Sequence, residues 1–537
     1  RQACLQVISQ IAPVGSYFHA ELERLIWPFL RLAFCVPRDF PSLAEALMMV
    51  PQWFPVTILL SPGKYTEDGL VINKPVVLRG TGQGVLLASD LVLSQQTCDD
   101  CDGFSIIENL QLASVDVTSG QWQLSNCFVN NITVRGSATV HFQQCSFQAI
   151  GSSAALSLRD DAEVKMIECS FCENPGSCIS TKNSPRVEIE RGNFTQNGAP
   201  VMLLRDSTKL RLSKSHFDSN KGCALLVRGE ASVEINSSHF SGHKMSAVAF
   251  QHQATGSISL SQFEANDGVV LLINGTAKVD VIENCFSKNG RTQVIEFQSA
   301  VGKPVKAKIV AKRQDETNQL THKLSYISGR DGEEWANLDE KNAMIRNQSG
   351  NTDLPYTLKE PMRFGQDHDG EGGQLKGVNL KKGTKRSVIA IQDSACATVK
   401  RNRLKCNDGY GILISGSAAA TLEENVLEDC QNTGICIEGT SQSMVKGNTV
   451  RSSKSIGVQV LDSACPTLEG NQICVSSKSA AIRCMGKSGG RIQKNLLKSW
   501  ERKHALVIGE EASPKVEEND IAGTKPEKTD SCVANQP

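Results

Sequence analysis

Apolar side chains recur along this chain at a nearly constant interval. Phenylalanines mark the period most clearly, at Phe147, Phe171, Phe194, Phe217, Phe240, Phe263 and Phe286. The differences between their successive positions are 24, and then 23 five times. A fixed period of about 20 to 50 residues indicates a repeat architecture in which each turn stacks on the next.

Four further apolar columns keep step with the phenylalanines. They lie fifteen, thirteen, seven and five residues before each Phe, and before Phe217 they are Met202, Leu204, Leu210 and Leu212. Apolar positions two residues apart have the periodicity of a strand. Turn-forming residues separate the first two strands. Each repeat therefore predicts two short strands and a third short segment that carries the Phe.

The same template returns near the C-terminus, where asparagines mark it. They are Asn402, Asn425, Asn448, Asn471, Asn495 and Asn519, whose positions differ by 23, 23, 23, 24 and 24 in turn. An aliphatic residue in the Phe position follows two residues after each. Asn side chains in register can hydrogen-bond along a stack. The spacing favours such an internal ladder over a ligand groove, and the chain is predicted to be an all-β parallel β-helix.

Five segments follow from where the period holds and where it fails. They are a helical segment at 1–30, a cap and first array at 31–300, an insertion at 301–387, a second array at 388–525 and a tail at 526–537. The insertion is rich in polar residues, so we expect it to be largely mobile. Ser42 and Glu45 form a capping-box pattern, which predicts a short helix that shields the first turn. The sequence leaves open whether the two arrays form one continuous solenoid.

Composition agrees with an aliphatic core. The 537 residues are 40% hydrophobic but only 5% aromatic, and 57 basic residues balance 57 acidic ones. Zero net charge does not indicate a nucleic-acid partner. No apolar run of about 18 residues suggests a membrane span. Among the 19 cysteines, Cys127, Cys145 and Cys169 occupy matching repeat positions, which predicts buried thiols and a cytoplasmic or nuclear location.

Two segments carry a resemblance to a known family. V-P-R-D-F-P-S-L-A-E-A-L (36–47) and I-L-L-S-P-G-K-Y-T-E (58–67) resemble the cap and first turn of pectin-lyase-like β-helix proteins. L-E-E-N-V-L-E-D-C-Q-N-T-G-I-C-I (422–437) resembles the repeats of carbohydrate-binding and sugar-hydrolase β-helix domains. Among intracellular proteins, the chain looks most like the β-helix of F-box ubiquitin-ligase adaptors. The resemblance implies a right-handed parallel β-helix.

No converging set of acid, base and stabilising residues stands out, so the sequence predicts no catalytic site, no metal and no cofactor. Cys98 and Cys101 form a lone C-x-x-C pair, which favours two loop thiols over a redox or zinc site. His216 and His239 lie one period apart and should stack in adjacent turns. The repeat itself explains that spacing, and a metal site is the less favoured alternative.

One surface pattern predicts a binding site. Basic residues stand twelve positions before the Phe, and leucines stand fourteen before it, in columns that should face outward. They are Arg159, Lys182, Arg205 and Arg228, and Leu203, Leu226 and Leu272. Neighbouring turns lie about 4.8 Å apart, and like charges at that distance favour binding of an anionic ligand. Exposed apolar residues favour an interaction site. Local neutralisation by acidic turn residues, and cover by another part of the chain, are the alternatives.

The combined pattern favours a non-catalytic protein-binding scaffold. Its expected partner is a protein segment with acidic or phosphorylated residues, and the F-box resemblance implies ubiquitin-ligase subunits as further partners. We expect no nucleic-acid or membrane partner. The alternative function is that of a polysaccharide-active enzyme of the pectin-lyase or polygalacturonase type, or of a carbohydrate-binding protein.

Overall fold

The structure is a computed structural model. It describes residues 33–50, 55–95, 104–149, 151, 153–198, 200–290, 387–405, 407, 409–453, 455–475, 479–499 and 505–522, and the backbone of three strands between 294 and 326. The chain divides into two compact units, Arg1–Asn193 and Phe194–Pro537. Each unit is built from turns of a parallel β-solenoid, and the described residues contain almost no helix.

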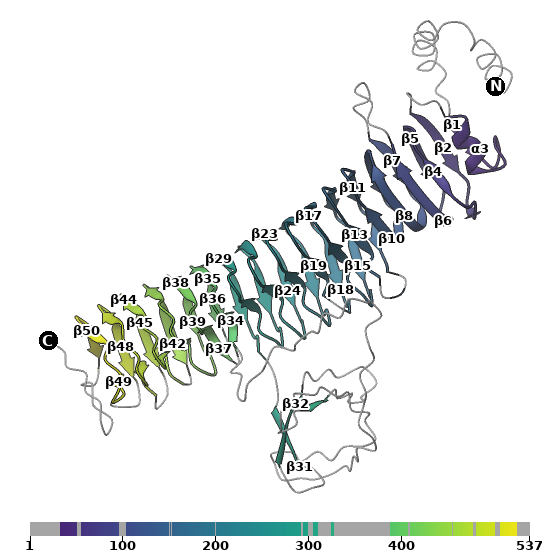
Figure 1. Ribbon diagram of the computed structural model, residues 1–537. Coiled ribbons are helices and arrows are strands. Elements are labelled where there is room, and N and C mark those ends of the chain that lie inside the picture. Colours follow the sequence, from purple (N-terminus) through teal and green to yellow (C-terminus); the bar gives the residue numbers. More distant parts are fainter. Residues whose placement is uncertain are drawn as a thin grey trace, which may run out of the picture. The chain divides into compact units, whose positions relative to one another are not determined.

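Each turn contributes strands to three rows, and within a row each strand pairs in parallel with the equivalent strand one turn away (Figure 1). The first row carries the apolar columns fifteen and thirteen before the Phe position. The second row carries those seven and five before it, and the third row carries the Phe position itself. The predicted period and the three-strand turn are therefore confirmed.

In the first unit, second-row strands pair with one another, while long strands join the third row to the first. The second row is β1 (Ala33–Val36), β2 (Val56–Leu60), β5 (Val76–Gly80), β7 (Ser105–Glu108), β9 (Gln121–Ser125), β11 (Thr139–Gln143), β14 (Glu163–Ile167) and β17 (Arg186–Glu190). The other two rows are β3 (Gly63–Tyr65), β4 (Leu70–Ile72), β6 (Val85–Ser94), β8 (Gln111–Ser119), β10 (Phe128–Val134), β12 (Ser146–Phe147), β13 (Leu156–Leu158), β15 (Ser170–Cys172) and β16 (Ile179–Thr181). Strand β18 (Asn193–Thr195) contains the division between the two units.

The second unit keeps the three rows separate throughout. Its first row is β19 (Met202–Leu204), β22 (Leu225–Val227), β25 (Val248–Phe250), β28 (Leu271–Ile273), β34 (Ser387–Ile391), β37 (Tyr410–Ile414), β40 (Ile435–Ile437), β43 (Val458–Val460), β46 (Ile482–Cys484) and β49 (Leu506–Ile508). Its second row is β20 (Lys209–Ser213), β23 (Ser232–Asn236), β26 (Thr255–Ser259), β29 (Lys278–Ile282), β35 (Cys396–Lys400), β38 (Ala419–Glu423), β41 (Met444–Lys446), β44 (Thr467–Glu469), β47 (Arg491–Gln493) and β50 (Lys515–Glu517). Its third row is β21 (His216–Asp218), β24 (His239–Ser241), β27 (Gln262–Glu264), β30 (Cys285–Ser287), β36 (Arg403–Lys405), β39 (Val426–Glu428), β42 (Thr449–Ser453), β45 (Gln472–Val475), β48 (Leu496–Ser499) and β51 (Asp520–Ala522).

The predicted inward columns form the cores. Met202, Leu204, Leu210 and Leu212 are all buried, and in the second unit Phe217 stacks on Phe240 with ring centroids 4.8 Å apart. Cys127, Cys145 and Cys169 are buried free thiols in the first unit, as the repeat predicts. Their sulfurs donate to nearby backbone carbonyls.

A short helix stands at the start of the first unit, as the capping-box pattern predicts. Helix α3 (Leu43–Met48) begins after Ser42, whose side-chain oxygen accepts a hydrogen bond from the Glu45 N–H. The Glu67 carboxylate accepts two further bonds, from the N–H groups of Leu43 and Ala44. Four N–H groups at a helix start lack internal partners, so these contacts account for three of them.

The second unit runs in register across the break in the period. Strand β28 pairs with β34, β29 with β35 and β30 with β36, so the turn before residue 290 stacks on the turn that begins at Ser387. The last described turns of the first array and the second array are therefore continuous. Strand β31 (Val294–Gln298), which lies just before the predicted insertion at 301–387, forms an antiparallel sheet with β32 (Pro304–Ile309) and β33 (Leu324–Tyr326) inside it. The rest of the insertion, like Cys98, Cys101 and residues 1–30, lies outside the described residues.

Two polar ladders run inside the second unit. One is the predicted asparagine ladder, in which Asn425 Nδ2 donates to Asn448 Oδ1 at 2.9 Å and Asn448 repeats the contact with Asn471 at 3.0 Å. A second column, three residues beyond the Phe position, links Asn266 to Asn289 and Asn289 to Asn407. Buried amides are stable here because each one meets a partner above or below it.

Candidate functional site

The first unit contains two of the predicted basic residues. Arg159 and Lys182 directly follow β13 and β16, which are in-register neighbours, and both side chains are exposed. Asp160 lies beside them in the turn, where its carboxylate accepts hydrogen bonds from the Gly136 N–H and the Asn183 side chain. These bonds to the turn lower the pKa of Asp160, with only a small contribution from Arg159.

The other predicted residues lie in the second unit. Leu203 pairs in register with Leu226, and Arg205 and Arg228 directly follow their strands. Arg205 is exposed, whereas Arg228 is half-buried and its Nε donates to Gln251 Oε1 at 2.9 Å. Leu203 and Leu226 are also half-buried. One basic pair therefore lies in each unit.

The leucine column continues past the predicted members. Leu272 pairs in register with Ala390, Ala390 pairs with Leu413, and Leu413 pairs with Cys436. These residues lie on the outer side of the first row. Tyr410 joins Leu413 and Cys436 in a buried apolar cluster. Sequence reasoning missed this continuation, although the same offset from the Phe position would have found it.

A groove lies on a different surface, the outer face of the second row. It crosses β29, β35, β38 and β41 of the second unit and has a volume of about 420 Å³. Its lining residues are Lys278, Val279, Asp280, Cys396, Ala397, Thr398, Ala419, Ala420, Thr421, Gln442 and Met444. None of them was predicted as a site residue.

Small side chains create the groove. In one outward column, Cys396 and Ala419 follow Lys278 on successive strands. In the neighbouring column, Thr398 and Thr421 follow Asp280. Met444, 43% exposed, closes that column at the next strand. Long side chains therefore stand at the two ends, and the middle is shallow because its side chains are short.

The groove offers both hydrogen-bond donors and acceptors. The Thr398 and Thr421 hydroxyls can donate and accept, the Asp280 carboxylate accepts, and the Lys278 ammonium donates. At the other end, the Gln442 amide can do both. A guest with many hydroxyl groups could pair with each of these groups.

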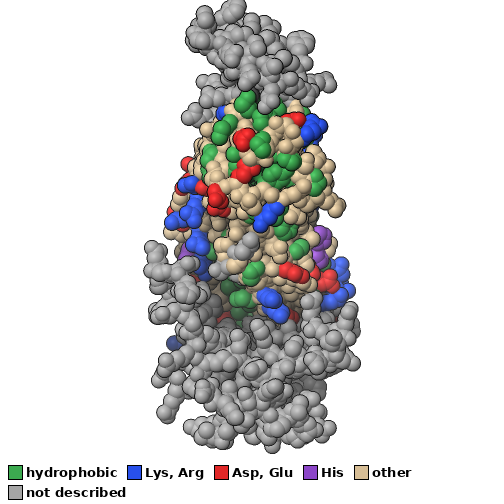
Figure 2. All heavy atoms as spheres, turned by 90° about the vertical axis from the view of Figure 1, so that its right-hand side faces the viewer, with side chains coloured by type: hydrophobic (Ala, Val, Ile, Leu, Met, Phe, Trp, Pro, Cys, Tyr) green, Lys and Arg blue, Asp and Glu red, His purple; other side chains and the backbone are tan. Residues whose placement is uncertain are grey.

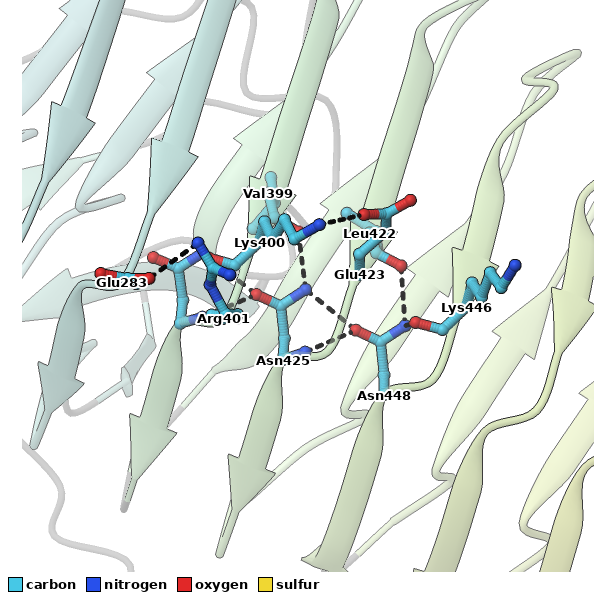
Figure 3. Close-up of polar contacts among 10 residues, drawn as sticks. Glu283, Val399, Lys400, Arg401, Leu422, Glu423, Asn425, Lys446 and Asn448 are labelled. Atoms are coloured by element: carbon cyan, nitrogen blue, oxygen red, sulfur yellow. Dashed lines mark hydrogen bonds and ion pairs between the residues drawn. The ribbon is translucent and has the colours of Figure 1, made fainter.

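Ion pairs line the adjacent edge of the second row. Lys400 Nζ lies 2.8 Å from Glu423 Oε2, and Arg401 Nη2 lies 2.8 Å from Glu283 Oε1 (Figure 3). The hydrogen bond from Lys400 lowers the pKa of the Glu423 carboxyl, and the charge of Lys400 adds to this effect. These side chains hold one another beside the groove, so they keep its edge polar.

Charges elsewhere are mixed in sign. On the face shown in Figure 2, acidic and basic side chains are interspersed with apolar and uncharged ones. Among the described residues, no helix is long and apolar enough to cross a membrane. Within the same residues, no group of three or more His, Cys, Asp or Glu side chains is placed to hold a metal ion.

The family is shown by the sequence. A family model described as a right handed beta helix region matches residues 113–286 and 368–528, which is more than half of the chain. The chain therefore belongs to the right-handed β-helix family, and its fold is a right-handed parallel β-solenoid of about 23 residues per turn. No curated protein matches the chain.

Solved structures share the fold at low sequence identity. A PL6 family alginate lyase is 10% identical, with 94% of this chain and 96% of that chain covered and a TM-score of 0.31. The periplasmic alginate epimerase AlgG is 8% identical, with 91% and 85% covered and a TM-score of 0.31. A PL6 family polysaccharide lyase from Pseudopedobacter saltans is 11% identical, with 91% and 92% covered and a TM-score of 0.31.

These comparisons correct two expectations. The comparisons contradict the expectation of a non-catalytic protein-binding scaffold, because the similar structures named above are polysaccharide lyases and an epimerase. The expected lack of enzyme activity is overturned by the same finding. The F-box resemblance is not shown. The error arose because the repeat motifs are structural and are shared by β-helices of unrelated function. Likeness at this level concerns the fold, so the function must be argued from the groove.

Proposed function

We propose that this protein binds carbohydrate and that the groove on the outer face of β29, β35, β38 and β41 holds the sugar chain. The observation that carries the proposal is the groove's lining, in which hydroxyl, carboxylate, ammonium and amide groups surround a floor of small side chains. Sugar hydroxyls both donate and accept hydrogen bonds, so a lining of mixed polarity suits them.

The direction of the groove also supports a chain-like ligand. Neighbouring strands lie about 4.8 Å apart, so a groove across four strands is about 14 Å long. Successive turns present equivalent side chains at that interval, as Thr398 and Thr421 do. A polymer with a repeat of similar length can make the same contact on each turn. A polysaccharide is such a polymer.

The test fills the groove without disturbing the core. Thr398→Arg with Thr421→Arg places two long side chains over the floor, because both threonines face outward from strands whose neighbouring residues are buried. Binding to a panel of immobilised neutral and acidic polysaccharides is measured by affinity electrophoresis. We expect the native protein to be retarded by at least one polysaccharide and the double variant to lose at least tenfold in affinity.

Thr467→Arg is the matched control. Thr467 lies in the same outward column on β44, one strand beyond Met444 and outside the groove lining. It should leave binding unchanged. Equal retardation of the native protein and the double variant would contradict the proposal, and so would an equal loss in the control. Reducing or unsaturated ends are assayed in the same incubations, because their release would show that the bound chain is also cleaved.

A further inference from the structure

Two histidines are stacked on the outer side of the third row. His216 begins β21 and His239 begins β24, and the two residues are in-register neighbours on these parallel strands. Their ring centroids lie 5.3 Å apart with an angle of 58° between the ring planes. Each His directly precedes a buried Phe of the core, so each imidazole faces outward.

The core holds the two backbones in place. Phe217 and Phe240, which follow the histidines, are fully buried, and their rings are stacked at an angle of 11°. The distance between the histidine Cα atoms is therefore fixed by packing, and only side-chain rotations remain. Groups preorganised in this way lose little entropy when they bind one ion together.

Acidic side chains lie close by. Asp218 follows His216 by two residues and therefore faces the same side, and its Oδ1 accepts a hydrogen bond from Ser241 Oγ at 2.7 Å. Glu264, on the next strand, is in register with Ser241 and pairs with Lys288 at 2.7 Å. Among the described residues, neither imidazole makes a hydrogen bond, so the ring nitrogens are available to a ligand.

We propose that His216 and His239 form a two-histidine site for a divalent transition-metal ion such as Zn²⁺, Cu²⁺ or Ni²⁺. Imidazole nitrogen suits these ions, whereas Mg²⁺ and Ca²⁺ prefer oxygen ligands. Metal–nitrogen bonds of about 2.0–2.1 Å require the two donor atoms to converge, and rotation of the inclined rings brings them together. The two imidazoles are the only ligands that the described residues supply, and water fills the remaining positions.

The site is independent of the carbohydrate groove. It uses the third row of the turns that contain β21 and β24, whereas the groove uses the second row from β29 onward. Failure of one proposal would therefore not affect the other.

The experiment titrates the full chain with ZnCl₂ and with NiCl₂ at pH 7.5 and measures affinity and stoichiometry by calorimetry. His216→Ala and His239→Ala should each remove one bound ion per chain or weaken its binding at least tenfold. His252→Ala is the matched control, since His252 is an exposed histidine in a turn of the same unit. It should change neither quantity.

Two results would overturn the proposal. One is an unchanged number of bound ions, with unchanged affinity, in both histidine variants. The other is an equal loss in the His252 control. Far-ultraviolet circular dichroism of each variant shows that the fold is intact, and retained polysaccharide binding in the histidine variants keeps this test separate from that of the groove.

Discussion

At the scale of single residues, His243 breaks the rule of its column. The column carries Asn220 one turn before and Asn266 one turn after, and the His243 N–H still donates to Asn266 Oδ1 at 3.0 Å. Neither ring nitrogen has a hydrogen-bond partner among the described residues, and the side chain is fully buried. Burial lowers the pKa of His243 to about 4, although the charge of Asp218 acts in the opposite direction.

This burial predicts a stability that depends on pH. The unfolded chain protonates His243 near pH 6.5 and the folded chain only near pH 4, so the unfolded state binds more protons between these values. Stability should therefore be complete above about pH 6.5 and fall as the pH drops toward 4, by about 3 kcal/mol in total. Thermal unfolding in the presence of a chelator, followed from pH 7.5 to pH 4, measures the loss.

His243→Asn isolates this contribution from that of the carboxyl groups. The variant restores an amide to the column and removes the titrating ring, so its thermal midpoint should fall less than that of the native protein over the same pH range. Parallel curves for the two proteins would show that His243 does not titrate in this range.

At the scale of elements, the asparagine ladder joins each turn to the next. Asn425 Nδ2 donates to the Val399 carbonyl at 2.7 Å, and its Oδ1 accepts from the Asn402 N–H at 3.0 Å. Figure 3 shows the Asn425 and Asn448 amides in line across neighbouring strands. One side chain thus satisfies buried backbone groups of the preceding turn and also contacts the amide of the following turn.

Asn425→Ala should destabilise the second unit strongly. The change leaves the buried Asn402 N–H and Val399 carbonyl without these partners, at a cost of about 1–3 kcal/mol for each group. Denaturant unfolding followed by circular dichroism measures the loss. Asn425→Ser should cost less, because serines at the equivalent positions accept the backbone N–H one turn away, as Ser238 Oγ does from Ser215. Equal stability of the native and Ala proteins would mean that the ladder contributes nothing.

The ladder and the rows could be predicted from the sequence because they follow the period directly. Met202, Leu204, Leu210 and Leu212 are buried where their columns place them. The groove could not be predicted in this way. Asp280 and Thr398 are 118 residues apart and become neighbours only because the chain returns in register after the insertion. The repeat spacing alone does not reveal which turn stacks on the turn before the insertion.

At the scale of the whole molecule, the break has a defined length. Asn284 bonds to Asn402 across 118 residues, whereas Asn402 bonds to Asn425 across 23. The difference, 118 less 23 or 95 residues, is the length added between one turn and the next. The parallel pairing of β28 with β34 is otherwise like that of any other pair in the row.

Deletion of residues 291–385 should therefore leave the solenoid intact. It restores an offset of 23 residues between Asn284 and Asn402, so every pairing across the junction can form as before. The thermal midpoint and polysaccharide binding should both be retained. Deletion of residues 291–391 removes β34 as well and leaves 17 residues, 118 less 101, between Asn284 and Asn402, so the turn across the junction cannot close and the second unit should lose stability. Unfolding of the first variant would show that the segment itself stabilises the solenoid.

The register across the break also has a consequence for synthesis on the ribosome. Strand β29 ends at residue 282, and its partner β35 is complete only at residue 400, 118 residues later. At about 5–20 residues per second, translation of that stretch takes about 6 to 24 seconds. During this interval the nascent solenoid ends in an open edge, whose unpaired N–H and C=O groups can recruit strands from other chains. The length of the insertion thus sets how long each growing chain must be shielded from its neighbours on a polysome.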